Sequence, residues 1–301
     1  MSFEDGMKGF TFGMISLICI GVNIILTTIG LSTIASIVSL AGLVTAIMAA
    51  QATALAEILG AAIALNMLFG IPIMAGAVIT AIVCTLMLWT NSYSRLETWI
   101  AGFVSVIAMS YLFEISMVHV DWPQAVVSWT VPNIPAGSML VVMSILGAVI
   151  MPHNLFLHSE IIQSRHWNLE DKALMEKQLR FEFVDTLFSM SIGWAINSAM
   201  ILLAAATFFV HGVSVSELQQ AQELLVPLLG ENAVHIFAIA LLFAGIASTT
   251  TAGMAGVTIF SGMFGESYDM KDIHSRVGLL LTFVPAVIVL YFINDPFWGL
   301  I

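Results

Sequence analysis

The tetrapeptide Met151-Pro152-His153-Asn154 holds the residues of this chain best suited to chemistry, because it interrupts an otherwise apolar stretch of membrane-spanning length. Pro152 has no amide hydrogen, so in a helix the carbonyl of Ala148, four residues earlier, would lose its donor. In lipid such a carbonyl is tolerated only where it is buried in protein or lines a wet cavity, and transporters bind ions at broken helices of this kind. The spacing therefore predicts a helix break that forms a cation site.

A thioether stands beside the expected free carbonyl. Met151 lies about one helical turn after Ala148, so its sulfur and the Ala148 oxygen can converge on one point. Mg²⁺ and Ca²⁺ prefer oxygen ligands alone, whereas sulfur favours softer transition metals, so the pair points to Mn²⁺ or Fe²⁺. A proline-kinked helix with a packing methionine is the alternative, and the spacing alone leaves it equally open.

The other polar residues of this stretch have several possible roles. His153 and His158 are separated by roughly 500° around a helix, so they face different ways and are not expected to bind one ion together. Each could move protons or line an inner pathway, or serve a structural role. For Asn154 the preferred interpretation is a cap on the restarted helix, with Pro152 marking the break.

Carboxylates elsewhere divide into two groups. Glu57 lies deep in an apolar run, where an ionisable side chain indicates a functional role. Such a side chain needs a partner, and Arg276 is one charged candidate. Glu114, Glu160 and Asp185 lie nearer the ends of apolar segments, which favours an interfacial position for each.

Composition identifies the elements that position these residues. The chain is 59% hydrophobic and 9% charged, against roughly 25% charged residues in an average soluble domain, which predicts an all-α polytopic membrane protein. The polar stretch 163–182 predicts a surface helix, and small-residue runs at 60–62, 204–206 and 245–256 predict close helix packing. About eight segments could cross the roughly 30 Å of hydrocarbon: 10–32, 37–69, 72–90, 98–118, 138–162, 184–210, 234–263 and 277–294.

Charge distribution predicts the orientation. All basic residues except Lys8 fall in loops on one predicted side, and the positive-inside rule makes that side cytoplasmic. We therefore expect a multi-pass protein of the cytoplasmic membrane. No phosphate loop, nucleic-acid surface or hydrolase arrangement is present in the sequence, so neither an enzyme, a cofactor nor a nucleic-acid partner is expected.

At these residues the chain resembles the Nramp family of divalent-metal transporters. Residues 147–159 are similar to the signature of the family's sixth helix. Three further stretches, 55–62, 243–256 and 276–285, resemble its third, eighth and ninth helices, while Asp185 and Asn197 fit its seventh. The resemblance covers roughly residues 50–300.

The resemblance implies a LeuT-like inverted-repeat fold with a metal site between the unwound first and sixth helices. The whole chain, 1–301, would form one transmembrane domain: a poorly matched segment 1–36, the third to fifth helices in 37–136, and the sixth to ninth in 137–301. Met151 would be the thioether ligand and Ala148 a carbonyl ligand. The proton or inner-pathway machinery would comprise His153, His158, Glu57 and its partner Arg276.

The chain also departs from the family pattern. The Asp-Pro-Gly-Asn motif, which supplies a carboxylate and an amide to the metal, is missing, and Asp295-Pro296 does not replace it because Phe297 follows. A fragment without the family's first and last helices is therefore expected, and it should bind metal weakly because it has no anionic ligand. Ala54 replaces a usual aspartate and Ser275 one of two paired arginines, which argues against proton coupling.

The leading hypothesis is transport of Mn²⁺ or Fe²⁺ across the cytoplasmic membrane by alternating access, with the metal ion and the lipid bilayer as partners and protons as a further candidate. The alternatives are a non-transporting scaffold or inactive fragment, a Mg²⁺-transporting relative, and an amino-acid permease of the same fold. The thioether of Met151 argues against the last two.

Overall fold

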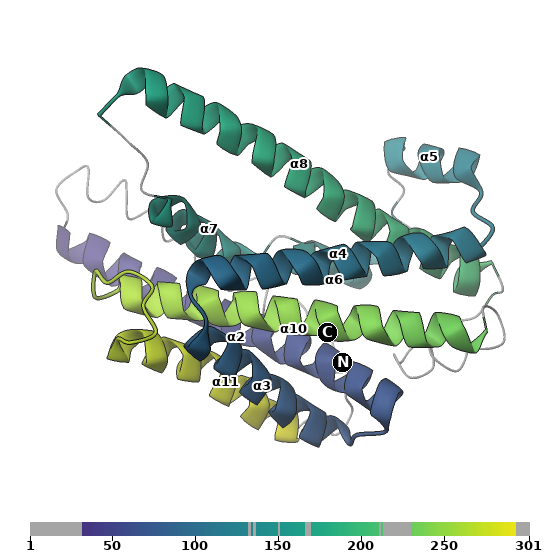
Figure 1. Cartoon of the computed structure of the whole chain (residues 1–301), viewed down its shortest axis with the longest axis horizontal. Coiled ribbons are helices and arrows are strands. Elements are labelled where there is room, and N and C mark those ends of the chain that lie inside the picture. Colours follow the sequence, from purple (N-terminus) through teal and green to yellow (C-terminus); the bar gives the residue numbers. More distant parts are fainter. Residues whose placement is uncertain are drawn as a thin grey trace.

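The computed structural model describes residues 32–131, 134, 137–149, 151–165, 170–210, 212 and 230–292. Their regular structure is helical throughout (Figure 1), and seven stretches are long and apolar enough to cross a membrane, as the all-α prediction requires. The predicted first span lies outside the described residues except for Ser32. The elements are α2 (Ser32–Phe69), α3 (Ile73–Thr90), α4 (Tyr93–Met117), α5 (Trp122–Thr130), α6 (Met139–Val149), α7 (Pro152–Ser164), α8 (Lys172–Ala204), the π-helix η1 (Ala205–Phe209), α10 (Glu231–Gly262) and α11 (Ile273–Phe292).

Local sequence explains the tight turn between α2 and α3. Gly70 adopts a positive φ of 66°, and its N–H donates to the Asn66 carbonyl at 2.8 Å, which closes the end of α2. Pro72, at the N-cap of α3, cannot continue the preceding helix. The two helices consequently pack side by side.

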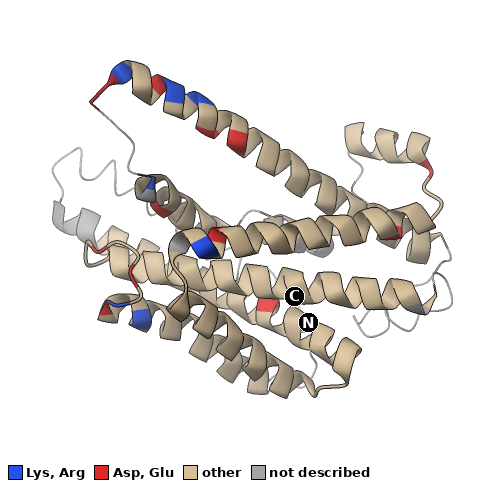
Figure 2. Ribbon diagram, viewed as in Figure 1, with Lys and Arg blue, Asp and Glu red and all other residues tan. Residues whose placement is uncertain are grey.

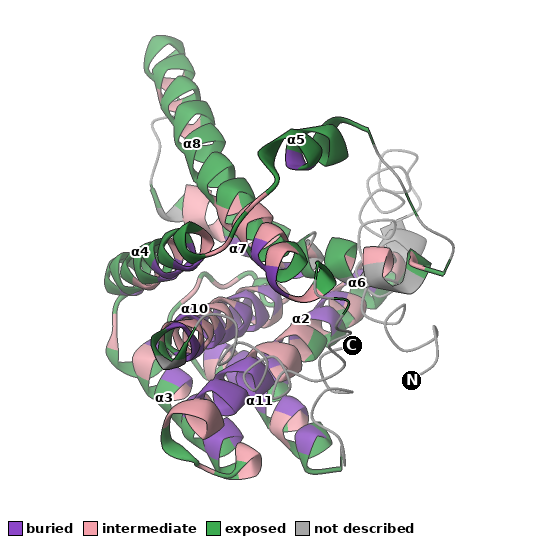
Figure 3. Cartoon of the chain, turned by 90° about the vertical axis from the view of Figure 1, so that its right-hand side faces the viewer, coloured by how far each residue is buried: buried purple, intermediate pink, exposed green. Residues whose placement is uncertain are grey.

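The helix α10 is the centre of the assembly and packs against α2, α3, α4, α7 and α11. Figure 3 shows most of the buried residues in α2, α10, α11 and α3, while α5 and α8 are largely exposed. A Cβ placed on Gly245 would lie 2.7 Å from the backbone nitrogen of Ala61. The predicted close packing of the runs 60–62 and 245–256 is therefore confirmed. In the run 204–206, Ala204 and Ala205 are exposed, so no close packing is seen there among the described residues.

The predicted surface helix at 163–182 is wrong for its second half. Asp171 caps α8, its carboxylate accepting from the N–H groups of Ala173 and Leu174 at 2.9 and 3.2 Å. From Lys172 the helix continues without interruption into the membrane-spanning stretch. Since the capping residue sets the helix start, the polar first turns belong to α8 and not to a separate element.

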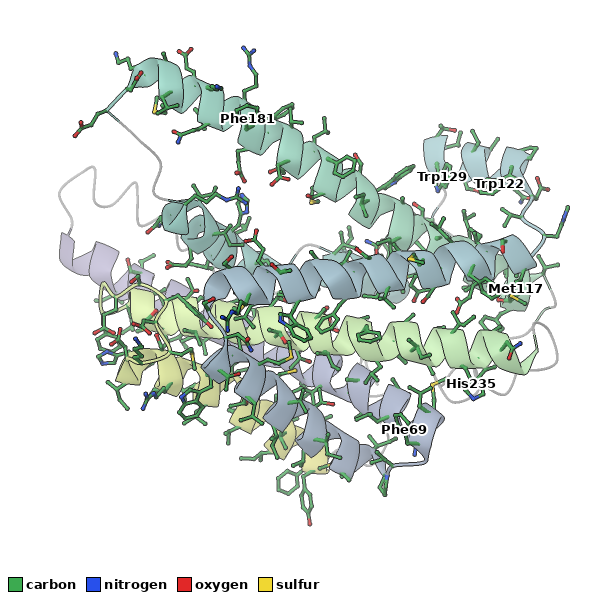
Figure 4. The ribbon with its side chains drawn as sticks, in the orientation of Figure 1. Phe69, Met117, Trp122, Trp129, Phe181 and His235 are labelled. Carbon is green, nitrogen blue, oxygen red and sulfur yellow. The ribbon has the colours of Figure 1, made fainter. Side chains whose placement is uncertain are left out.

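The two ends of the molecule differ in charge. Figure 2 shows the lysines and arginines of the described residues at one end, which confirms that these basic residues share a side. The opposite end carries Met117 of α4, Trp122 and Trp129 of α5, and His235 of α10 (Figure 4). Both tryptophans are largely exposed, as residues at a membrane interface are.

Candidate metal centre

The predicted helix break is confirmed. Helix α6 ends at Val149, Met151 has an extended backbone with φ −88° and ψ 101°, and α7 begins at Pro152. The proline is thus the first residue of α7, where its missing N–H has no consequence. The alternative, a continuous helix kinked at the proline, does not form.

The break has an electrostatic polarity. The last carbonyls of α6, including that of exposed Ala148, have no donor within their own helix. A helix C-terminus attracts cations and an N-terminus repels them, so a cation is favoured on the α6 side of the break. The half-buried thioether of Met151 stands between the two helix ends.

Asn154 does not cap α7 as predicted. Met151 occupies the N-cap position, and no side chain makes a capping hydrogen bond there. The Asn154 backbone N–H donates to the Met151 carbonyl at 3.0 Å, and its side-chain Nδ2 donates to the Met151 Sδ at 3.3 Å. The cap prediction fails because α7 begins with Pro152, which places Asn154 already inside the first turn.

The two histidines of α7 lie in different surroundings, as their spacing predicted. His153 is 1% exposed, and neither ring nitrogen has a hydrogen-bond partner among the described residues. His158 is exposed. His153 can therefore act toward the protein interior and His158 toward the surroundings.

Glu57 and Arg276 do not pair in this structure. The Glu57 side chain has the Ser248 hydroxyl of α10 as its hydrogen-bonding neighbour. The Arg276 Nε donates to the Met270 carbonyl at 3.0 Å, and its guanidinium lies 5.3 Å from the centre of the Trp89 ring. The ion pairs found among the described residues include neither side chain, so the expected contact between them does not form.

A charged cluster at the basic end was not foreseen from the sequence. Arg165, directly after α7, lies 3.8 Å from each of three carboxylates: Glu97 of α4 and Glu182 and Asp185 of α8. Arg165, Glu182 and Asp185 line part of a cavity of about 510 Å³ together with Gln178, Phe181, Val184 and Phe188. Asp185 is 59% exposed there, whereas Asn197, also exposed, lies three turns further along α8. A pathway role for either residue stays a prediction.

Two further acidic residues have definite surroundings. Glu160 of α7 accepts the Tyr268 N–H at 3.1 Å, which joins α7 to the connection between α10 and α11. Glu114 is 1% exposed, and neither carboxyl oxygen has a hydrogen-bond partner among the described residues. This burial was not predicted, and it arises because Glu114 continues the buried stripe of α4 formed by Ile107, Ser110 and Tyr111. Their i, i+3, i+4, i+7 spacing was the signal that could have shown this. The predicted interfacial position of Glu114 stays a prediction.

The donors available at the break are neutral. Within the described part of the chain, no three His, Cys, Asp or Glu side chains gather where they could hold a metal ion. Any cation at this break would therefore depend on backbone oxygen, amide and thioether donors, together with ligands from elsewhere.

Comparisons with known proteins place these features in a family. The family described as natural resistance-associated macrophage protein-like (Nramp) matches residues 22–301. A protein of Caldanaerobacter subterraneus subsp. tengcongensis named divalent metal cation transporter MntH is 36% identical over 263 residues, which cover 86% of this chain and 61% of that relative. A protein of Listeria welshimeri with the same name is 37% identical over 247 residues, covering 79% and 54% of the two chains.

A solved structure shows the same fold. The Eremococcus coleocola manganese transporter, crystallised with an aromatic bis-isothiourea compound, superposes with a TM-score of 0.70 at 26% identity and covers 98% of this chain. The present chain covers 59% of that transporter, as it covers little more than half of the relatives above. Its helices have the LeuT-like fold of Nramp transporters. The chain is a multi-pass membrane protein and belongs to the Nramp family.

Proposed function

We propose that this chain carries out transport of Mn²⁺ or Fe²⁺ across the cytoplasmic membrane, with the metal ion as substrate and the break between α6 and α7 as its site. One observation carries the proposal: Met151 has an extended backbone between the two helix ends, close in sequence to the last carbonyls of α6, which have no donor within their own helix. Relatives named divalent metal cation transporters and a solved manganese transporter support the substrate class. Sulfur in the donor set favours transition metals over Mg²⁺.

The two half-helices differ in a way that suits alternating access. Leu157 and Ile161 hold α7 in the main apolar core, where it packs against α2 and α10. Within the described residues α6 has no comparable packing against another helix. Motion of α6 about the break would change which side of the membrane the site faces while α7 stays in place.

The proton route of the proposal involves Glu57, His153, His158 and Arg276, but the coupling is expected to be weak. Ala54 is fully buried and apolar where the family usually has an aspartate, and Ser275 is buried where it usually has an arginine. Uptake should therefore proceed at equal pH on both sides of the membrane. A strict requirement for a pH gradient would contradict this part of the proposal.

Metal uptake into proteoliposomes tests the site directly. The Met151→Ala variant of the full chain should lower Mn²⁺ uptake by about tenfold or more, since removing groups at a metal site costs on the order of 10- to 100-fold in affinity or activity. Met190→Ala is the matched control, because Met190 of α8 is 66% exposed. Equal uptake by wild type and Met151→Ala would refute the site.

A non-transporting scaffold is the second candidate. It is supported by the neutral donor set, since no acidic cluster for a metal is present among the described residues. Calorimetric titration of the purified chain with Mn²⁺ separates the two functions, because a scaffold shows no saturable binding.

A further inference from the structure

The side-chain amide of Asn154 has two unlike surroundings. Its Nδ2 donates to the Met151 sulfur at 3.3 Å. Its Oδ1 is buried and has no hydrogen-bond partner among the described residues. The neighbouring His153 ring is 1% exposed and equally without a partner there. The Asn154 oxygen and the His153 ring, on adjacent residues at the break, therefore have unused hydrogen-bonding capacity within the described part of the chain.

The contact with sulfur restrains a flexible ligand. A methionine side chain has three rotatable bonds and adopts many positions unless something fixes it. The N–H donation from Asn154 uses one lone pair of the Met151 sulfur and leaves the other for a metal ion. The amide thus selects one orientation of the thioether before any ion arrives.

The buried oxygen points to a second role. A buried amide oxygen without a donor destabilises the fold, so native structures rarely retain one without cause. Turning the Asn154 amide over would place Oδ1 close to the present Nδ2 position, 3.3 Å from the sulfur. Neighbouring donors on one octahedral ion lie roughly 3 Å apart for metal–oxygen bonds of about 2.1 Å. The exchanged amide would therefore present oxygen and sulfur to the same ion.

We propose that Asn154 is a further metal-site residue: its amide nitrogen positions the Met151 thioether in the empty site, and its amide oxygen binds the transition-metal cation in the loaded one. This inference rests on the proposed function and adds a hard donor to the soft sulfur of the same helix turn. A mixed oxygen and sulfur pair suits Mn²⁺ and Fe²⁺, which lie between oxygen-preferring Mg²⁺ and more sulfur-preferring ions such as Cd²⁺.

Titration calorimetry of the purified full chain with Mn²⁺ and with Cd²⁺ tests the inference. Asn154→Ala should weaken Mn²⁺ binding by about tenfold or more and Cd²⁺ binding by less, so the preference shifts toward Cd²⁺. Asn154→Asp keeps an oxygen and adds a negative charge, so it should bind Mn²⁺ at least as tightly as wild type. Asn232→Ala, at an exposed position near the start of α10, is the matched control and should change neither metal.

The outcomes separate this inference from the proposed function. If Asn154→Asp loses Mn²⁺ binding as Asn154→Ala does, the oxygen is not a ligand and the inference fails. If both Asn154 variants bind like wild type while Met151→Ala does not, the inference fails and the site stands. If wild type shows no saturable binding, the proposed function itself fails. Circular dichroism of each variant confirms that its helices are intact, and Asn154→Ser replaces Asn154→Ala if that variant does not fold.

Discussion

At the scale of single residues, the most unusual side chain outside the break is Glu114. Its carboxyl group is 1% exposed in a membrane-spanning helix, and no hydrogen-bond partner reaches either oxygen within the described residues. The neighbouring apolar cluster contains Ile107 and Tyr111 of α4 with Leu203 of α8. Such a group lowers the stability of the fold, and ionisable groups retained inside membrane-spanning segments are commonly functional.

Replacing Glu114 by leucine should therefore stabilise the protein. A leucine of similar volume removes an unsatisfied buried polar group, so the free energy of unfolding should rise by about 1–3 kcal/mol. Thermal unfolding of the purified protein in detergent measures the change, with the exposed Glu176→Leu of α8 as control. A lower melting temperature for Glu114→Leu would show that the carboxyl makes a stabilising contact in the folded protein.

The surroundings of some residues can be predicted from the sequence, and those of others cannot. The break at Pro152 follows from the chemistry of one peptide group, so local sequence suffices. The burial of Glu114 could have been predicted from the helical spacing of the stripe on α4. The partners of Arg165 depend on how α4 packs against α8, and a single sequence does not contain that arrangement. The proposed partnership of Glu57 with Arg276 fails for the same reason, since Met270 and Trp89 take the arginine instead.

At the scale of helices, the contact between α2 and α10 sets the core against which α7 is held. Gly245 of α10 meets Ala61 of α2 so closely that a side chain at the glycine would contact backbone, which cannot move aside cheaply. In a membrane, small residues of this kind let helix backbones approach and gain dispersion energy. The break is thus attached to α7, which packs in this core, and to α6, which has no comparable packing against another helix in the part of the chain that the structure describes.

Gly245→Ala should separate α2 from α10. The new Cβ would lie 2.7 Å from the Ala61 nitrogen and 2.9 Å from its Cα, and overpacking of this type costs typically about 1–3 kcal/mol. Gly102→Ala is the matched control, because a Cβ at Gly102 of α4 has no neighbour within 4 Å. Alanine favours helix over glycine, so this control should be neutral or slightly stabilising. Equal melting temperatures for the two variants would contradict the close contact.

At the scale of the whole molecule, the fold has one basic end and one end that carries exposed tryptophans (Figures 2 and 4). At the basic end, close to the last residue of α7, Arg165 forms ion pairs with the carboxylates of Glu97, Glu182 and Asp185. Ion pairs of this length near the protein surface contribute little to stability. The difference in charge between the two ends therefore affects the orientation of the protein in the membrane and access to the break more than it affects the stability of the fold.

The positive-inside rule makes the basic end cytoplasmic, and cysteine labelling in cells tests this orientation. Lys177→Cys of α8 and Trp122→Cys of α5 place exposed thiols at opposite ends, in a chain whose native cysteines are replaced by Cys19→Ala and Cys84→Ala. A membrane-impermeant maleimide should label the residue 122 thiol in intact cells, and the residue 177 thiol only after the membrane is opened. The reverse pattern would invert the orientation, and the α6 side of the break would then face the opposite compartment.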